Sequence, residues 1–430
     1  MSTSPPAKPA ETESAPEKPG RSFKATRRTA LLGAMFLMAV SAVGPGFITQ
    51  TSQFTMQLGA AFACAILISV IVDIGIQMNV WRTLGVSGLY AQELGNKILP
   101  GVGWALAVLV FFGGIVFNVG NIAGAGLGMN AMFGLDASWG GAISVVIAAG
   151  IFLSKRAGLA MDRFVVVCGA VLILLMAYMA IVTRAPVGDA LIQTVAPVLP
   201  EGQTINDFFF VTTTLIGGTV GGYITYAGAH RLIASGNTGP ENASSIAKTS
   251  AMGIVVASAI RYLLFLAVLG VIVSYSTLAE TDYDNVAAAA FLTVLGEWGL
   301  RVFGVAFWVA AITSIIGATY TSISFITTQK TSDKLKTWLV MGFLAVTCTI
   351  FLTLGQAPTT LLIMAGALNG IILPIGFAVI LYAAWFKRGS LMGGYRYPLW
   401  LLVTGTVLWL LTIYMGINSL TGIAALWQTG

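Results

Sequence analysis

The stretch "GGTVGGYITY", from Gly217 to Tyr226, lies inside a segment that is otherwise apolar enough to cross a bilayer. Four glycines within six residues are a poor choice for a helix, because each costs roughly 1 kcal/mol relative to alanine. In hydrocarbon, every backbone N–H and C=O that leaves a helix must find another partner. We therefore expect a break in a transmembrane helix here. The alternative is that these glycines only let a neighbouring helix pack closely.

The composition identifies the class of protein around this stretch. Of the 430 residues, 57% are hydrophobic and only 9% are charged, whereas soluble domains carry about 25% charged residues. The chain is therefore a polytopic helical membrane protein, with the lipid bilayer as its environment. The net charge of +6 is spread over the loops between apolar segments, so we expect no nucleic-acid partner. No catalytic triad, Cys/His cluster or phosphate-binding loop is present, so we do not expect an enzyme.

Hydropathy, with breaks at charged or Gly/Pro-rich loops, predicts eleven spans. They lie at 29–57, 59–81, 103–132, 139–154, 163–183, 208–229, 245–275, 299–327, 337–354, 359–385 and 397–424. All 22 Lys and Arg residues except Arg184, Arg261 and Arg301 fall in the N-terminal tail and the even-numbered loops. The positive-inside rule then predicts a protein of the inner (cytoplasmic) cell membrane with its N-terminus in the cytoplasm and its C-terminus outside.

A second predicted break divides the chain into two halves. The first span contains "VGPGFITQTSQFT", from Val43 to Thr55, and lies five spans before the glycine-rich stretch. Matched interruptions in two halves are typical of inverted-repeat transporters, whose binding site lies at the breaks. If the glycines line such a site, Gly221→Ala and Gly222→Ala should abolish binding and leave the protein folded.

We accordingly predict five regions. Residues 1–26 form a disordered cytoplasmic tail, rich in Pro, Glu, Ser and Lys. Residues 27–184 form a first repeat of spans 1–5, and 208–386 form a second, inverted repeat of spans 6–10. Residues 185–207 connect the repeats outside the cell, and 387–430 contain the eleventh span and the C-terminus.

Several motifs, in this order along the chain, resemble the Nramp family of metal transporters. They are "GPGF" in the first span, "GLYAQELGNKILP" after the second, "GAGLGMNAMFG" ending the third, the glycine-rich stretch in the sixth and Leu373-Pro374 in the tenth. The resemblance covers roughly residues 27–424. It implies an all-α, LeuT-type fold of two inverted five-helix repeats plus one helix, with spans 1 and 6 broken at mid-membrane.

The residues that bind metal in that family are absent here. Nramp transporters hold the ion with an Asp-Pro-Gly-Asn motif at the first break and a Met-Pro-His motif at the sixth span. We expect the first break at Thr49–Gln53, and it holds no acid. The Met-Pro-His motif matches Gly221, Gly222 and Tyr223, the family's tenth-span Gln matches Ile372, and the acids of its proton route match Asn118 and Asn121.

This chemistry argues against a divalent cation, which needs anionic oxygens or soft sulfur in low dielectric. We predict a site of neutral groups for a small organic anion or amino-acid-like solute, carried by alternating access. A likeness to permeases encoded beside 5-oxoprolinase genes suggests 5-oxoproline. The alternatives are an atypical manganese or magnesium transporter, or a sensor that no longer cycles. The predicted substrate-binding residues are Gln50, Thr51, Ser52, Gln53, Asn118, Asn121, Gly218, Thr219, Gly221, Gly222 and Tyr223.

Four further residues are candidates for ion coupling. Asp73 and Arg261 are the acid and the base that lie well inside predicted spans, where charges normally pair or line a pathway. They form either a structural pair or a coupling site. Thr313 and Ser314 begin a hydroxyl-rich stretch of span eight, and in LeuT-type transporters sodium is often held there. Coupling to sodium or to protons is expected, with no other cofactor and no obligate protein partner.

Overall fold

The computed structural model describes residues 31, 43–280, 285–327 and 331–429 and is helical throughout these ranges. The predicted tail at 1–26 lies outside them. The helices in chain order are α2 Pro45–Leu58, η1 Gly59–Ala61, α3 Phe62–Ser87, α4 Ala91–Ile98, α5 Val102–Phe133, α6 Ala137–Leu153, α7 Lys155–Val182, α8 Val187–Val195, α9 Ile205–Val220, α10 Ile224–Ala234, η2 Pro240–Asn242, α11 Ala243–Ser274, α12 Val286–Ile326, α13 Asp333–Leu354, α14 Pro358–Phe386, α15 Arg388–Leu391, α16 Leu399–Asn418 and α17 Leu420–Thr429.

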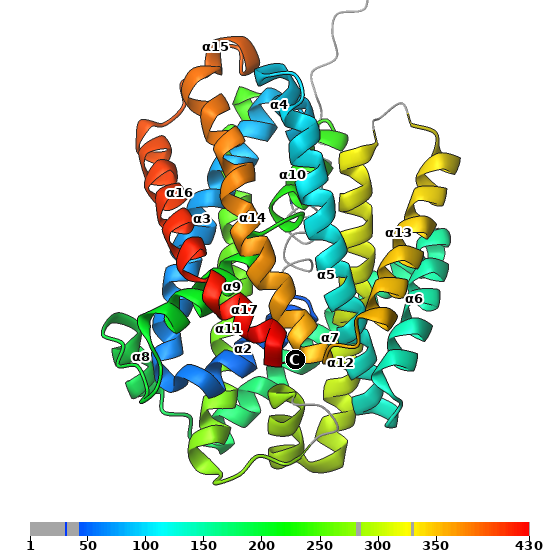
Figure 1. Ribbon diagram of the computed structural model, residues 1–430, viewed down its shortest axis with the longest axis vertical. Helices are drawn as coiled ribbons and strands as arrows, with labels where there is room; N and C mark the ends of the chain where they lie inside the picture. Colours follow the sequence, from blue (N-terminus) through cyan, green and yellow to red (C-terminus); the bar gives the residue numbers. More distant parts are fainter. Residues whose placement is uncertain (1–30, 32–42, 281–284, 328–330, 430) are drawn as a thin grey trace, which may run out of the picture.

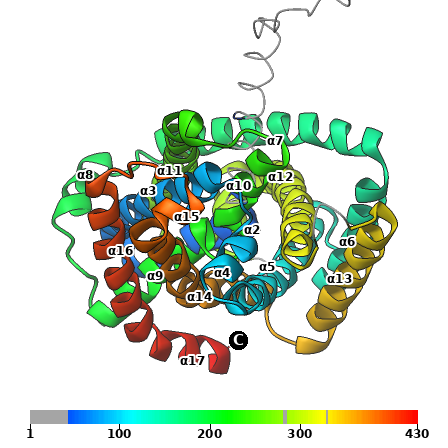
Figure 2. The same ribbon diagram turned by 90° about the horizontal axis from the view of Figure 1, so that it is seen from above.

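Several of the long helices, such as α5 and α14, run roughly along one direction (Figure 1), whereas α7 lies across them in the view from above (Figure 2). Seen from above, α2 and α10 lie in the middle, while α6, α13 and α16 lie on the outside (Figure 2). The outer helices leave large apolar side chains exposed, such as Val146, Trp338 and Val407. Apolar side chains on this surface suit a lipid environment.

The glycine-rich stretch does break a helix. α9 ends at Val220 and α10 begins at Ile224, with Gly221 extended and Gly222 at a φ of +53°. The left-handed region is open to glycine, which has no Cβ. The break therefore occupies Gly221–Tyr223, as the sequence predicts for the sixth span.

The first two glycines of the stretch, Gly217 and Gly218, allow a neighbouring helix to pack closely, which is the alternative that the sequence left open. A methyl group on Gly217 would lie 2.7 Å from the Cα of Gly370, against the backbone of α14. Gly218 is covered by the side chain of Gln50 from α2. Gly217 and Gly218 thus allow close helix packing, whereas Gly221 and Gly222 form the break.

The described part of the first span begins with two non-helical residues, which lie before the predicted break and are called the first break below. Val43 and Gly44 are non-helical, and α2 begins at Pro45, while the preceding part of this span lies outside the described residues. Proline suits this position, because the first turn of a helix leaves its N–H groups unbonded in any case. The predicted break at Thr49–Gln53 is wrong, since these residues are helical. Hydroxyls there bond back to carbonyls one turn earlier, Thr51 to Phe47 at 2.6 Å and Ser52 to Ile48 at 2.8 Å.

Every predicted span coincides with a described helix, apart from the beginning of the first. Within the described ranges, eight stretches are long and apolar enough to cross a membrane, or nine if a pair bent by 103° at residues 183–186 counts as one. The total of eleven stays a prediction. α12 turns sharply at Gly296, so its first part is a separate short helix before the eighth span. The eleventh span ends at Asn418, and α17 follows it after Ser419.

Candidate functional site

Buried polar groups meet at the beginning of α2. A methyl group on Gly44 would lie 2.6 Å from Ser314 Oγ of α12 and 3.8 Å from Asn121 Oδ1 of α5. Ser314 and Asn121 are 1% and 4% exposed, and neither Ser314 Oγ nor Asn121 Nδ2 has a hydrogen-bond partner in the described part of the chain. No acidic side chain occupies the first turn of α2. The free N–H groups and the dipole of that turn favour an anionic group.

Tyr223 adds a third such group from the break in span six. Its ring packs edge-on against Phe117, with 5.4 Å between the ring centroids, and its side chain lies beside Asn121. The Tyr223 side chain is fully buried, and its hydroxyl has no partner with hydrogen-bond geometry among the described residues. Asn121, Ser314 and Tyr223 therefore bring unpartnered polar atoms from three elements to the region of the two breaks.

Asn369 of α14 also contacts the break, and the sequence interpretation missed it. Its Nδ2 donates to the carbonyls of Gly113 at 3.2 Å and Ala365 at 2.8 Å. Its Oδ1, without a partner in the described ranges, lies against Gly113 and Gly222. The signal in the sequence is slight: a single amide within a long apolar span, three residues before the predicted Ile372.

Gln50 joins three helices beneath this site. Its Nε2 donates to the carbonyl of Leu362 on α14 at 3.1 Å, and the side chain lies between Gly218 of α9 and Gly366 of α14. Its Oε1 is buried and unpartnered within the described residues. Gln50 thus contacts α9, the first half of span six, rather than the break itself.

Other predicted substrate residues point elsewhere or are already bonded. Asn118 donates to Thr347 Oγ1 of α13 at 2.8 Å. Thr51 and Ser52 bond within α2, as described above. Gln53 is half-buried in α2, with its Oε1 unpartnered in the described part of the chain. Thr313, predicted for ion coupling, donates to Val309 and Ala310 within α12, both at 3.0 Å.

Asp73 and Arg261 lie near the end of α9. Arg261 Nη1 donates to Thr219 Oγ1 at 3.0 Å, and its guanidinium carbon lies 4.2 Å from the ring centroid of Phe47. Asp73 is 1% exposed, lies beside Thr219 and is close enough to feel the Arg261 charge. No direct ion pair joins the two, and the pair found in the described ranges is Arg301–Glu297 at 3.2 Å. The predicted residues thus share a cluster without a salt bridge.

The side chains of α3 satisfy the other end of the break. Trp81 Nε1 donates to the carbonyl of Thr225 at 2.9 Å, and Thr225 Oγ1 donates to Gln77 Oε1 at 2.6 Å. Asp73, Gln77 and Trp81 are four residues apart, so they share one face of α3. This face accompanies the broken span from Thr219 to Thr225.

His230, the single histidine of the chain, bonds the C-terminal half of α10 to neighbouring helices. His230 Nε2 accepts from the Ala91 N–H at 3.3 Å, and its Nδ1 lies 3.2 Å from Ser324 Oγ. Its ring also packs on Tyr90 and Phe325, at 4.5 and 4.8 Å between centroids. His230 therefore connects α10 with the start of α4 and the end of α12.

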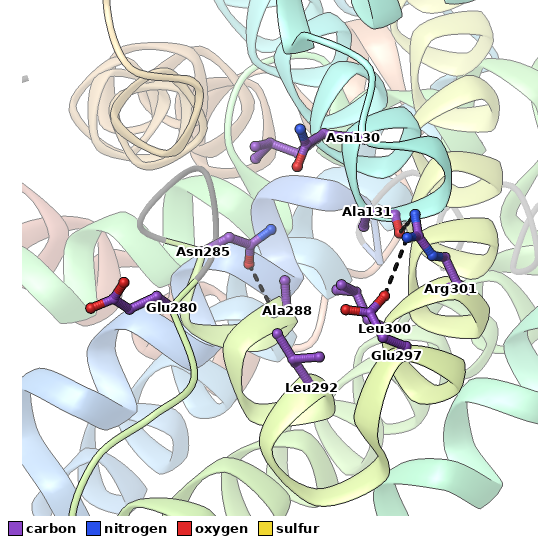
Figure 3. Close-up of a pocket in the computed structure, with 11 residues that line it drawn as sticks. Asn130, Ala131, Glu280, Asn285, Ala288, Leu292, Glu297, Leu300 and Arg301 are labelled. Atoms are coloured by element: carbon purple, nitrogen blue, oxygen red, sulfur yellow. Dashed lines mark hydrogen bonds and ion pairs between the residues drawn. The ribbon is translucent and has the colours of Figure 1, made fainter.

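Two cavities lie at opposite ends of α12. One of about 240 Å³ is lined by Asn130, Asn285, Glu297 and Arg301, among others (Figure 3). Arg301 donates hydrogen bonds to the Ala131 and Met132 carbonyls at the end of α5 and to the Glu297 carboxylate. Its guanidinium is therefore already bonded within the protein. The other cavity, of about 400 Å³, is lined by residues that include Tyr320, Ser324 and Lys336.

The fold and the site together define a membrane transporter of the LeuT type, with a broken helix in span six and neutral polar groups at that break and at the start of α2. The more particular assignment comes from comparison with known proteins. Residues 35–422 match the family model described as natural resistance-associated macrophage protein-like, or Nramp. The chain belongs to the Nramp family, as its motifs predict, and is a multi-pass membrane transporter.

Two relatives with similar sequences are described as uncharacterized membrane proteins. The chain is 47% identical to an uncharacterized membrane protein, YcsG, of Bacillus subtilis strain 168 over 407 residues, or 94% of this chain and 98% of the relative. It is 43% identical to an uncharacterized membrane protein of Haemophilus influenzae, over 91% of this chain and 95% of the relative.

Solved structures confirm the fold. A point mutant of the Eremococcus coleocola manganese transporter superposes with a TM-score of 0.68 at 16% identity, over 96% of this chain and 90% of the other. MhsT in complex with L-phenylalanine gives a TM-score of 0.65 at 13% identity, over 90% and 98%. At these identities the likeness establishes the fold alone.

In the structure, the Nramp motif Asp-Pro-Gly-Asn corresponds to the start of α2 rather than to Thr49–Gln53. The Pro-Gly pair of Asp-Pro-Gly-Asn matches Pro45 and Gly46 at the start of α2. Gly44 and Phe47 then stand where the family has Asp and Asn. The acid is missing in this alignment too, and the vacated position contacts Ser314 and Asn121.

Proposed function

We propose that this Nramp-family transporter carries a small organic solute with a carboxylate group, such as an amino acid or 5-oxoproline, rather than a metal ion. One observation supports this proposal above the others. Buried side chains with unpartnered atoms in the described part of the chain are neutral here: Ser314 and Asn121 lie next to the N-terminus of α2, and Tyr223 and Asn369 lie at the break in span six. Such donors suit a carboxylate and the polar groups of an organic molecule.

The ligand chemistry disfavours a divalent metal at this position. Within the described ranges, no three His, Cys, Asp or Glu side chains are placed together to hold a metal ion. Neutral amides and hydroxyls can complete a coordination shell, but they do not offset two positive charges in a dry site. The fold does not choose between solutes, because one structural neighbour is a manganese transporter and another is a complex with L-phenylalanine.

Ser314 also retains a role in the proposed coupling to a cation. Its hydroxyl lies between α12 and Gly44 at the first break, whereas the neighbouring Thr313 hydroxyl is bonded within its helix. A monovalent ion can be held by neutral oxygens, so sodium there is compatible with this chemistry.

The test compares solutes on purified protein. We expect 5-oxo-L-proline or an L-amino acid, with or without sodium, to raise the melting temperature in a saturable way. Ser314→Ala and Asn121→Ala should remove this shift. Thr313→Ala is the matched control, because it removes a hydroxyl from the adjacent position without touching the breaks.

A different result would support the second candidate, a manganese or magnesium transporter with an atypical site. Saturable binding of Mn²⁺ or Mg²⁺ by calorimetry, lost in Asn121→Ala or Ser314→Ala and kept in Thr313→Ala, would show that neutral ligands suffice here. The proposal of an organic substrate would then be wrong.

A further inference from the structure

Asp73 is a buried acid whose carboxyl oxygens have no hydrogen-bond partner among the described residues. It is 1% exposed in the middle of α3. An ionised carboxylate in such a place is costly unless it is paired and hydrogen-bonded. The surroundings of Asp73 therefore fit the protonated acid better than the anion.

The Thr219 hydroxyl, which lies beside Asp73, is bonded in a way that favours the same state. Its single hydrogen is used on the carbonyl of Leu215 at 2.9 Å, and one of its lone pairs accepts from Arg261 at 3.0 Å. While the bond to Leu215 is made, the Thr219 hydrogen is not given to the Asp73 carboxylate. The hydroxyl has a second lone pair, which can accept the O–H of a protonated acid.

Arg261 connects this acid with both breaks. Its guanidinium bonds Thr219, two residues before Gly221, and covers Phe47, three residues after Gly44. Its Nε and Nη2 have no partner among the described residues. The guanidinium thus holds the end of α9 and the start of α2, and it keeps free N–H groups for another acceptor.

The neighbouring helices supply no other charge that acts on Asp73. α3 packs on α8, α9, α10, α11, α14 and α16, among others, and in the described ranges the one charge that acts on Asp73 is that of Arg261. The remaining charged or titratable groups on these six helices are Asp189, Asp207, Tyr226, His230, Arg231, Lys248, Tyr262, Tyr382 and Tyr414.

We propose that Asp73 is the residue that binds the coupling proton, and that Arg261 transmits its charge state to the two broken helices. With the proton bound, Asp73 is neutral and Arg261 stays on Thr219 and Phe47, as observed. When the proton leaves, the carboxylate attracts the guanidinium, which lets go of α9 and α2. Arg261 remains protonated throughout, so one proton is bound and released in each cycle.

A sodium ion at Asp73 fits the same surroundings poorly. It needs several oxygen ligands, whereas Thr219 is the polar neighbour that the structure shows beside the acid. It would also lie beside the guanidinium of Arg261, and like charges in low dielectric repel strongly. The inference deepens the proposed transport function by assigning the coupling ion and its residue.

Infrared spectroscopy of the full-length protein tests this without any transported solute, so it can fail independently of the proposed substrate class. In protein labelled with ¹³C in its aspartate carboxyl groups, we expect the stretch of a buried protonated acid at neutral pH, lost at alkaline pH. Asp73→Asn should lack this band, and Asp207→Asn, at the exposed start of α9, should keep it.

A second variant covers the case in which Asp73→Asn does not fold. Thr219→Val removes the acceptor proposed for the acid proton but keeps the size of the side chain. It should move the midpoint of the band to a lower pH, about tenfold in proton affinity or more. If the band is absent from wild type at every pH, or unchanged by Thr219→Val, Asp73 does not bind the proton and forms only a structural cluster with Arg261.

Discussion

Gly222→Ala tests how tightly the break in span six is held. Gly222 has a φ of +53°, and a methyl group there would overlap Asn369 Oδ1 and lie 2.9 Å from Asn369 Cγ. The left-handed backbone costs about 1–2 kcal/mol for alanine. Asn369 can yield only by weakening its bonds to Gly113 and Ala365, each worth about 0.5–1.5 kcal/mol. We expect a loss of about 2–5 kcal/mol in the free energy of unfolding.

This expectation replaces the one from sequence, which assumed that methyl groups at Gly221 and Gly222 would enter an open gap and leave the fold intact. The structure instead places packed atoms there, since a methyl on Gly221 would lie 2.7 Å from Gly217 Cα. Loss of binding in these variants would therefore be accompanied by loss of stability.

The assay is unfolding in mixed micelles, followed by tryptophan fluorescence, as a double-mutant cycle with Asn369→Ala. Removing the amide should recover about 1–3 kcal/mol in the Gly222→Ala background, a coupling typical of residues in contact. Gly134→Ala is the control for the backbone alone, because it has a φ of +69° and no neighbours within 4 Å of the added methyl. If Gly222→Ala costs no more than Gly134→Ala, and Asn369→Ala gives no recovery, the close contact with the break does not exist.

Two further predictions concern the helices around the site. Gly217→Ala should destabilise the protein by about 1–3 kcal/mol, because the added methyl would meet the backbone of α14. Gly150→Ala is the control, because the space around Gly150 is open. Equal melting temperatures of the two variants would contradict this prediction. Trp81→Phe should cost about 0.5–1.5 kcal/mol by removing the hydrogen bond from Trp81 Nε1 to the Thr225 carbonyl, and unchanged thermal unfolding would show that the bond does not support the break.

The fold could be predicted because its signals are local. Apolar runs of membrane-spanning length identify the spans, and four glycines in one of them predict the break that Gly221 and Gly222 make. The first break was placed wrongly because hydroxyl-rich sequence resembles unwound backbone. In the structure, Thr51 and Ser52 bond to their own helix, and Pro45 begins it.

The site could be predicted only in part, since it depends on distances between helices. Asn121 and Ser314 are separated by almost two hundred residues, and only the packing of α5 and α12 brings both to Gly44. Asn118 was an equally good candidate by residue type, but it is one turn from the position that faces the breaks and bonds Thr347 instead. Asn369 lies in none of the motifs that the sequence analysis recognised, so it could not be identified as a site residue.

The side chains that stabilise the breaks are different from the side chains that are proposed to bind the substrate. Substitutions at the proposed binding residues can therefore change the substrate without destabilising the broken helices. Trp81 and Gln77 bond Thr225 at the start of α10, and Asn369 donates to two backbone carbonyls, although Gln77 Nε2 and Asn369 Oδ1 themselves have no partner among the described residues. Asn121, Tyr223 and Ser314 have unpartnered atoms within the described residues, so the fold gains no hydrogen bond from these atoms. Replacing acids with neutral groups at such positions changes the ligands a site can bind without removing a contact that keeps the broken helices in place. A fold shared with a manganese transporter is therefore compatible with a site of different chemistry.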